Sequence, residues 1–419
     1  MTVLLILAMI ALVVLGMPIA LALGVVAMFL ILGTGEAPGN IIPISMFGGT
    51  NNFPLLAIPL FMVAGELMNA CGLAERLINF ATSLVGFITG GLAHVVVVTS
   101  MFYAEISGSS VADAAALGSV FIPEMKRRGY PGGMAAALLS CASTMAILIP
   151  PSLPMILYGV IADVSVAKLF LAGFVPGILV AIALGILSYR MAKKNGWEIP
   201  TTKFSFREVV RTFLQAFWAL FLPVIILGGI LGGIFTPTEA AGVAVFAALI
   251  IGLFIYRQLN WRDLPRILVS AANQTAVVML IIATSAVLGW YLTSDQVPQQ
   301  LADAMLSLTS NKYAILLLLN IFFLIVGMFL HSTAAIIMLV PILMPLINNV
   351  GIDPVQFGLI LTMNLGIGQQ TPPVASVLLT TCSVGKVSLA QTFPYLKYYV
   401  TAMLCILALI TYIPQLTIQ

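Results

Sequence analysis

The sequence predicts an all-α, polytopic membrane protein in which an inverted repeat carries two re-entrant hairpins and two proline-broken helices. Composition is the first reason, because 61% of the 419 residues are hydrophobic and 7% are charged, with a mean hydropathy of +1.14. A soluble domain carries about 25% charged residues. The second reason is that Pro150-Pro151 and Pro372-Pro373 interrupt two apolar stretches 222 positions apart. The third is that the surrounding pattern repeats at nearly the same offset, which indicates duplication.

Length, charge and cysteine content exclude several classes of protein. A chain this apolar has room for on the order of ten spans and for no large soluble domain. The net charge of +3 comes from few basic residues in loops, so membrane lipid is an expected partner and nucleic acid is not. The four cysteines are scattered through apolar segments and suit small buried hydrophobes, not disulfides. No basic residue precedes the apolar start at 3–15, so a cleaved signal peptide is not expected.

Each apolar run that is bounded by Gly, Pro or charge predicts a helix. In the first half the predicted helices are 2–15, 18–33, 54–70, 90–106, 111–127, 132–148, 153–161 and 166–190. After a polar link at 190–211, the second half gives 212–232, 237–257, 263–292, 313–329, 335–349, 355–368, 375–383 and 388–413.

Two amphipathic stretches, 73–86 and 297–309, lie just before the segment pairs 90–106 with 111–127 and 313–329 with 335–349. They are either interfacial helices that join a fixed scaffold to a moving hairpin module or surface helices without a mechanical role.

The two halves match segment by segment. The proline pairs correspond at an offset of 222, Ser165 corresponds to Ser388 at 223, and Pro18 corresponds to Pro237 at 219. One such coincidence would mean little. A nearly constant spacing over the whole chain is strong evidence of duplication.

Two segment pairs are predicted to enter the membrane and return on the same side: 90–106 with 111–127, and 313–329 with 335–349. Their tips, 107–110 and 331–333, are short, polar and rich in small residues, and each arm is shorter than a full span of about 20 residues. With these pairs not crossing, five crossings separate the starts of the two repeats. An odd number of crossings inverts the second repeat.

The placement of Lys and Arg supports the inversion. With sides assigned by this scheme, 14 of the 17 basic residues share one side, whereas Lys168 and Lys312 fall opposite and Lys397 is ambiguous. The richer side is cytoplasmic. The first hairpin is therefore expected to enter from the cytoplasm and the second from the outside.

This scheme divides the chain into five consecutive regions. They are a scaffold and arm at 1–86, a first hairpin and broken helix at 87–190, a cytoplasmic link at 191–211, a second scaffold and arm at 212–309, and a second hairpin and broken helix at 310–419.

Small and polar residues gather at both tips and both breaks. Hydroxyls, amide oxygens and freed carbonyls are oxygen donors that suit Na⁺. Two matched clusters beside two matched breaks favour a binding site over close helix packing alone. The predicted Na⁺ ligands are Ser107, Gly108, Ser109, Ser110, Ser143, Thr144, Gly327, Ser332, Thr333, Gly366 and Thr371.

An anionic substrate fits the same region. Helix N-termini at the tips favour a carboxylate, and the predicted cavity contains no Lys or Arg. Bound cations and helix dipoles must then neutralise the substrate, which predicts ion-coupled symport. The predicted substrate-binding residues are Asp113, Pro150, Ser152, His331, Asn364, Gln369 and Gln370.

Acids inside apolar stretches need individual interpretation, since charge is costly in a membrane and often functional. Asp113 either stabilises the N-terminus of its helix or binds an ion. Glu239 is best explained as an acid in a first helical turn, and the roles of Glu66 and Glu105 stay open. His94 is expected to be structural.

These residues together resemble the large membrane subunit of tripartite ATP-independent periplasmic (TRAP) transporters, the DctM-like family, over essentially the whole chain. Its marks are Ile58-Pro59-Leu60-Phe61, Ala64-Gly65-Glu66-Leu67-Met68, Ser107-Gly108-Ser109 with Ala112-Asp113, Ile149-Pro150-Pro151-Ser152, Phe235-Thr236-Pro237-Thr238-Glu239-Ala240 and Thr371-Pro372-Pro373.

The resemblance implies Na⁺-driven uptake of an organic acid across the bacterial inner membrane. It also implies a small four-helix membrane subunit and a periplasmic substrate-binding protein as partners. Within the chain it implies a scaffold and an elevator-type transport domain that holds both hairpins.

The chain departs from the family pattern at the second break and the second tip. Similar proteins often carry apolar residues before Thr371-Pro372-Pro373, where this chain has Gln369 and Gln370, and many have an acid at the position of His331. These changes suggest a polar, polyhydroxylated acid. Sialic acid is the first expectation and a C4-dicarboxylate the second.

Two other functions compete with Na⁺-coupled transport. An intramembrane serine protease would pair the serines of the first tip with His331, but the repeat already accounts for both tips. A passive channel would move its solute without depending on an Na⁺ gradient.

Overall fold

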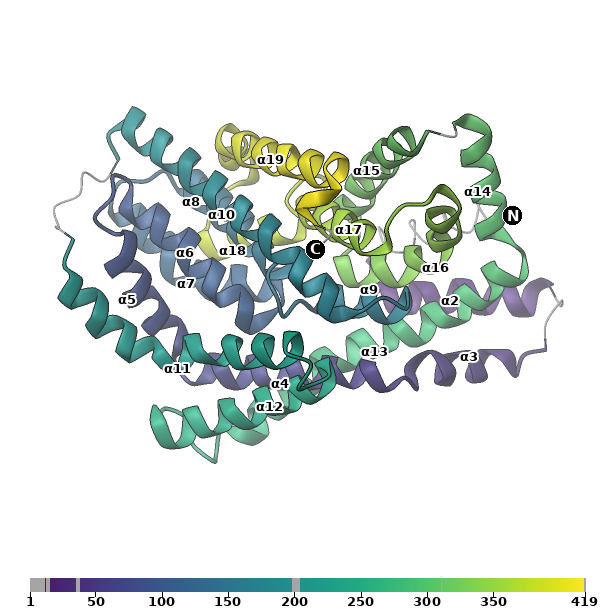
Figure 1. Ribbon diagram of the computed structural model, residues 1–419, viewed down its shortest axis with the longest axis horizontal. Coiled ribbons are helices and arrows are strands. Elements are labelled where there is room, and N and C mark those ends of the chain that lie inside the picture. Colours follow the sequence, from purple (N-terminus) through teal and green to yellow (C-terminus); the bar gives the residue numbers. More distant parts are fainter. Residues whose placement is uncertain (1–11, 13–15, 35–37, 198–203, 310, 418–419) are drawn as a thin grey trace.

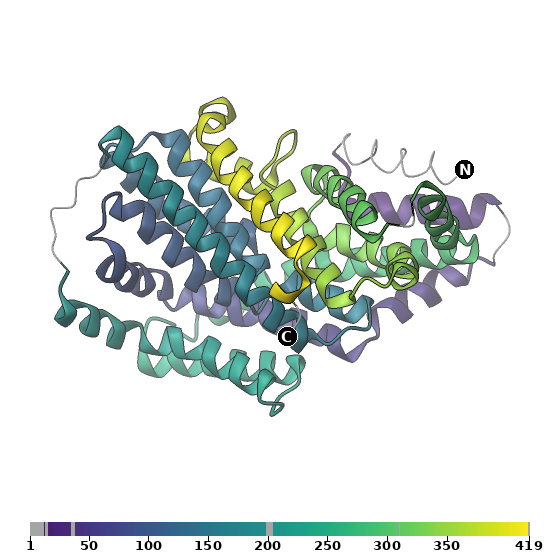
Figure 2. The same ribbon diagram turned by 45° about the horizontal axis from the view of Figure 1, so that its top comes forward.

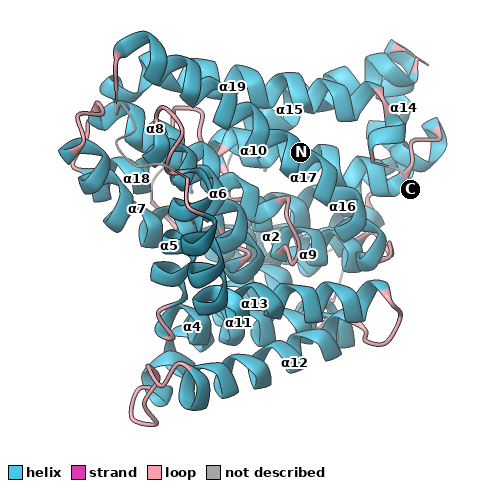
Figure 3. Cartoon of the chain, turned by 60° about the vertical axis from the view of Figure 1, so that its left-hand side comes forward, coloured by secondary structure: helices cyan, strands magenta, loops and turns pink. Residues whose placement is uncertain are grey.

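The computed structural model describes residues 12, 16–34, 38–197, 204–309 and 311–417, without the side chains of Thr34, Ile106 and Ser107. The predicted helix at 2–15 therefore lies outside the described residues, apart from Leu12. All regular structure in the described part of the chain is helical (Figure 3). This confirms the predicted all-α class.

The first repeat contains nine α-helices and two short 3₁₀ turns among its described residues. They are α2 (Ile19–Thr34), α3 (Ile41–Thr50), η1 (Phe53–Leu56), α4 (Ala57–Ala70), α5 (Leu73–Val85), α6 (Gly91–Ser107), α7 (Ser110–Arg127), α8 (Gly132–Ser143), η2 (Thr144–Ile147), α9 (Leu153–Ile161) and α10 (Val166–Asn195).

The second repeat follows the same order. It contains α11 (Phe206–Leu231), α12 (Pro237–Ile250), the π-turn η3 (Ile251–Ile255), α13 (Leu264–Ser294), α14 (Val297–Leu308), α15 (Lys312–Phe329), α16 (Ser332–Val350), α17 (Pro354–Gly368), α18 (Ser376–Gly385), α19 (Leu389–Tyr412) and the 3₁₀ turn η4 (Pro414–Leu416).

The helix boundaries confirm the duplication. α7 and α16 begin 222 residues apart, and so do α8 and α17. The packing is exchanged between the repeats: α7 packs on α18 while its counterpart α16 packs on α9, and α12 packs on α4 while its counterpart α2 packs on α13. Both breaks also contain a cis Pro–Pro peptide bond.

The helices form two groups by their contacts. α2, α3, α4, α11, α12 and α13 pack on one another and form the lower layer in Figure 1. α6 to α10 and α15 to α19 form the second group, in which α10 and α19 run side by side (Figure 2). The hairpins and the breaks all belong to the second group.

Eight described helices are long and apolar enough to cross a membrane, fewer than the ten or so predicted. By length and composition, these eight include α15 and α16, the arms of the second hairpin. Their tip, however, is enclosed by protein, with Leu330 8% and Ser332 0% exposed, and Ser110 of the first tip is 1% exposed. Buried tips are what re-entrant hairpins require.

One helix was missed by the sequence analysis. α3 contains Pro43, Gly48 and Gly49, which suggest a loop. Pro43 lies in the first helical turn, where backbone N–H groups have no acceptor within the helix, so a proline there costs no hydrogen bond. A Cβ at Gly49 would overlap the Ala286 side chain of α13, so this glycine permits close helix contact.

The polar link is shorter than predicted because helices extend into it from both sides. α10 continues to Asn195, with Lys193 and Lys194 in its last turn and Gly196 in the left-handed conformation at φ 69°. Lysines near a helix C-terminus and a glycine after it both favour this ending. α11 already begins at Phe206.

The second break approaches the second hairpin as closely as backbone allows. A Cβ at Gly368 would lie 2.5 Å from both Cα and the carbonyl carbon of Gly327. Gly368 is therefore needed for the close contact with Gly327 of α15. In the same way, Gly366 is needed for the contact of α17 with the Thr144 and Ile147 side chains.

We expect Gly368→Ala to lower the stability of the purified protein by about 1–3 kcal/mol, because backbone cannot move aside as a side chain can. The matched control is Gly289→Ala in α13, where a Cβ meets nothing within 4 Å. Thermal unfolding in detergent measures both. Equal unfolding temperatures for the two variants would show that the close approach is wrong.

Candidate functional site

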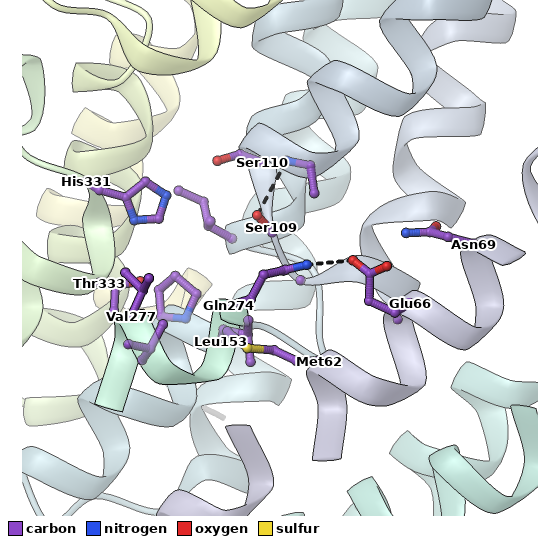
Figure 4. Close-up of a pocket in the computed structure, with 16 residues that line it drawn as sticks. Met62, Glu66, Asn69, Ser109, Ser110, Leu153, Gln274, Val277, His331 and Thr333 are labelled. Atoms are coloured by element: carbon purple, nitrogen blue, oxygen red, sulfur yellow. Dashed lines mark hydrogen bonds between the residues drawn. The ribbon is translucent and has the colours of Figure 1, made fainter. Parts of the chain in front are cut away.

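A cavity of about 270 Å³ lies where both hairpin tips meet the first break and two helices of the other group (Figure 4). The first tip contributes Gly108, Ser109 and Ser110, and the second contributes His331 and Thr333. Residues of η2 and α9 line it from the break, and residues of α4 and α13 close the opposite side. The cavity thus lies between the two helix groups.

The first tip is shaped by Gly108, which ends α6 in the left-handed conformation at φ 59°. A Cβ there would lie 3.1 Å from the Pro151 carbonyl oxygen, so the tip rests directly on the break. Ser109 follows as the N-cap of α7, and its side chain accepts a hydrogen bond from the Ala112 N–H. The Ser107 side chain lies outside the described part.

The second tip is closed in a similar way. His331 is the extended N-cap residue of α16, and it lines the cavity together with Thr333, while Ser332 is fully buried behind them. The Ala375 N–H, just after the second proline pair, donates to the Met328 carbonyl at 3.4 Å. Each tip is therefore fixed against the break of its own repeat.

The breaks satisfy much of their own backbone. Ser152 is the N-cap of α9: its hydroxyl donates to the Ile147 carbonyl at 2.8 Å and accepts from the Met155 N–H at 3.4 Å. Thr371 donates to the Ile367 carbonyl at 3.0 Å. These bonds cap helix ends, so Ser152, Pro150 and Thr371 support the cavity without lining it.

Two glutamines connect the breaks and the tips. The Ser110 hydroxyl donates to Gln369 Oε1 at 3.1 Å, and Gln369 Nε2 donates to the Ser332 hydroxyl. Gln370 Nε2 donates to the Thr144 hydroxyl in η2. Both glutamines are at most 1% exposed and stand behind the cavity wall.

Asn364 has a different environment from the one predicted. Its amide nitrogen donates to Asn320 Oδ1 of α15 at 2.7 Å and to the Ile360 carbonyl at 2.8 Å. Asn320 in turn donates to the Thr411 hydroxyl of α19. Asn364 therefore faces away from the cavity into a buried polar chain.

The other predicted residues lie behind the cavity. Ser143 and Asp113 are fully buried, with Asp113 in the first turn of α7. Ser143, Thr144, Gly327, Gly366 and Asp113 are not among the residues that line it. Their predicted roles in binding Na⁺ or substrate stay predictions.

Most of the opposite wall of the cavity was not predicted from the sequence. Glu66 and Asn69 of α4 and Gln274 of α13 line the cavity, and Gln274 Nε2 donates to Glu66 Oε1 at 2.6 Å (Figure 4). The sequence leaves the role of Glu66 open. Gln274 was detectable only as a polar interruption of the apolar segment 263–292.

The electrostatics of the cavity are unusual for the binding of an organic anion. None of the described residues that line it is Lys or Arg, and Glu66 is the acid among them. Hydroxyl and amide oxygens can coordinate a cation, and the imidazole, hydroxyls and amides can bind a polar solute. The arrangement suits binding and not covalent chemistry.

A protein-family model described as "Tripartite ATP-independent periplasmic transporter, DctM component" matches residues 6–416. The chain is 41% identical over 403 residues to the isethionate TRAP transporter permease protein DctMQ of Oleidesulfovibrio alaskensis. That match covers 96% of this chain and 64% of the relative, so the chain spans less than two thirds of that protein.

Two further relatives match along nearly their whole length. The sialic acid TRAP transporter large permease protein SiaM of Vibrio cholerae is 40% identical over 403 residues, which cover 96% of this chain and 94% of SiaM. The C4-dicarboxylate TRAP transporter large permease protein DctM of Rhodobacter capsulatus is 34% identical over 424 residues, with 98% and 96% covered.

The fold is also similar to a solved structure. The crystal structure of the YdaH transporter of Alcanivorax borkumensis superimposes with a TM-score of 0.61 at 12% identity, covering 88% of this chain and 86% of that one. At this identity the likeness concerns the fold alone.

We expect Thr144→Val to lower the stability by about 1–2 kcal/mol, because the buried Gln370 amide loses its acceptor in η2. Thr381→Val is the matched control: Thr381 is equally buried, but its hydroxyl donates only to the Leu378 carbonyl of its own helix. Thermal unfolding measures the stability of both variants. A loss of stability in Thr381→Val as large as in Thr144→Val would contradict the contribution of the hydrogen bond between Gln370 and Thr144.

Proposed function

This chain belongs to the DctM component family of tripartite ATP-independent periplasmic transporters, and from that membership we propose that it imports an organic acid driven by an Na⁺ gradient. It is a multi-pass membrane protein of a permease family and not an enzyme. We place it in the bacterial inner membrane, where import of a periplasmic solute takes place.

The observation that carries the proposal is the meeting of both tips and the first break around one cavity, with the glutamines of the second break directly behind its wall. None of the described residues that line this cavity is Lys or Arg. Ser110 and Ser332 hydrogen-bond to the same glutamine, and Thr144 bonds to the next one. Paired helix breaks near the membrane midplane are typical sites for a substrate and its coupling ion. Oxygen donors at such a site suit Na⁺.

The two helix groups support an elevator-type mechanism. The group with the hairpins, α6 to α10 and α15 to α19, is the proposed transport domain. The group of α2 to α4 and α11 to α13 is the proposed scaffold, and the cavity between them becomes accessible from either side when one group slides along the other.

The proposed partners follow from the family. A small four-helix membrane subunit associates with the chain, and a periplasmic substrate-binding protein delivers the acid. The names of the relatives attribute isethionate, sialic acid and C4-dicarboxylate to different members, so membership alone leaves the substrate open.

We favour sialic acid over a C4-dicarboxylate. The cavity offers two amides, an imidazole and three hydroxyls, from Asn69, Gln274, His331, Ser109, Ser110 and Thr333. These groups match the hydroxyls of a polyhydroxylated acid, whereas a C4-dicarboxylate presents two carboxylates to a cavity whose described lining residues include no Lys or Arg.

The remaining rival is a passive channel, and uphill accumulation distinguishes it from symport. Proteoliposomes that contain the chain, its small subunit and a candidate binding protein are loaded with K⁺ and diluted into Na⁺. A symporter accumulates sialic acid above the outside concentration only with the Na⁺ gradient. A channel merely equilibrates it.

We expect Ser109→Ala and Ser110→Ala, which each remove a hydroxyl that lines the cavity, to raise the Na⁺ concentration at half-maximal uptake about fivefold while the protein is still expressed. Thr401→Ala on the exposed face of α19, where the hydroxyl bonds only to the Lys397 carbonyl, is the matched control. Unchanged Na⁺ activation in both site variants would refute the ligand assignment.

A further inference from the structure

Gln369 is the one described side chain whose hydrogen bonds reach both hairpin tips. Its Oε1 accepts from Ser110 at 3.1 Å, and its Nε2 donates to Ser332. All three side chains are at least 99% buried. Solvent cannot replace these bonds, so the amide and the two hydroxyls determine one another's orientation.

The backbone of Gln369 is fixed from both sides of the second break. Its N–H donates to the Leu365 carbonyl of α17 at 3.0 Å, and its carbonyl accepts from the Val377 N–H of α18 at 3.1 Å. The amide is therefore presented to the tips from a rigid position.

The two serines are matched positions of the repeat, but Gln369 has no match. Ser110 begins α7 and Ser332 begins α16, 222 residues later. The position 222 residues before Gln369 is Ile147, an apolar residue in η2. One unduplicated amide therefore contacts two duplicated hydroxyls.

An amide cannot treat the two hydroxyls alike. It has an acceptor end and a donor end, and a serine hydroxyl has a single proton. Ser110 donates that proton to Gln369 Oε1, so only its lone pairs are available to a ligand in the cavity that it lines. A carboxylate oxygen has nothing to gain from Ser110, whereas a cation or a donor group does.

We propose that Gln369 is a positioning residue that commits Ser110 to act as an acceptor, so that the coupling cation binds at the first tip. The carboxylate of the organic acid then binds at the second tip, where Thr333 and His331 line the cavity and can donate. This inference rests on the proposed Na⁺-coupled function and assigns different ligands to the two halves of a symmetric site.

The test measures Na⁺ binding to the purified chain, without substrate or partners. The probe is NaCl in place of KCl at constant ionic strength, and the readout is the Na⁺ concentration at half-maximal rise in unfolding temperature. Gln369→Met preserves the shape but frees the Ser110 proton, and it should raise that concentration about fivefold or more.

Two further variants separate positioning from stability. In Gln369→Glu, Ser110 still donates to a carboxyl oxygen, so the half-maximal Na⁺ concentration should be no higher than in the unmodified chain. Gln356→Met is the matched control: Gln356 is a 1% exposed glutamine of α17, the helix that Gln369 follows, and its amide donates to the Ile410 and Thr411 carbonyls. It should lower the unfolding temperature without changing the Na⁺ dependence.

The outcomes are distinguishable. If Na⁺ gives no more stabilisation than K⁺ in the unmodified chain, the proposed function fails and this inference fails with it. If the unmodified chain responds but Gln369→Met has the same Na⁺ dependence, or Gln369→Glu is weakened as much as Gln369→Met, only the inference is overturned.

Discussion

The constraint on which this structure depends is that backbone freed by a helix break inside a membrane must find its partners within the protein. Each break meets part of this requirement with hydrogen bonds inside the protein. The Ser152 hydroxyl donates to the Ile147 carbonyl at the first break, and the Ala375 N–H after the second break donates to the Met328 carbonyl of the second hairpin. Gly108 of the first tip lies against the Pro151 carbonyl, so each hairpin packs on a break and the cavity forms beside these contacts.

Duplication explains the frame of the site but not its chemistry. Matched helices exchange packing partners between the repeats, and this places the two tips on opposite sides of one cavity. The unmatched residues Gln369, Gln370 and Glu66 then give its two halves different donors and acceptors. A duplicated chain gains a directional site wherever one copy of a buried position becomes polar and the other stays apolar, as with Gln369 and Ile147.

The sequence predicted what depends on local rules and repetition. Proline pairs break helices wherever they stand, and a constant offset identifies repeats without any structure. α3 was missed because its proline and glycines suggest a loop, although Pro43 is tolerated in the first turn and Gly49 permits contact with α13. Asn364 was assigned to the substrate because the sequence does not show which face of its helix points to the cavity. The pair of Glu66 and Gln274 joins residues 208 positions apart, so only the fold could reveal it.

None of the described residues that line the cavity is basic, and this has a mechanistic consequence for the proposed symport. A carboxylate that enters such a site alone loses its hydration without gaining a counter-charge. An Na⁺ ion that enters alone also loses its hydration and finds few acidic side chains to compensate for it. Each ion lowers the free energy of the other when both are bound, so the fully loaded and the empty states are favoured over the half-loaded ones. Tight coupling then follows from what the cavity lacks: a fixed arginine or lysine would stabilise the acid without Na⁺ and would let it cross uncoupled from the gradient.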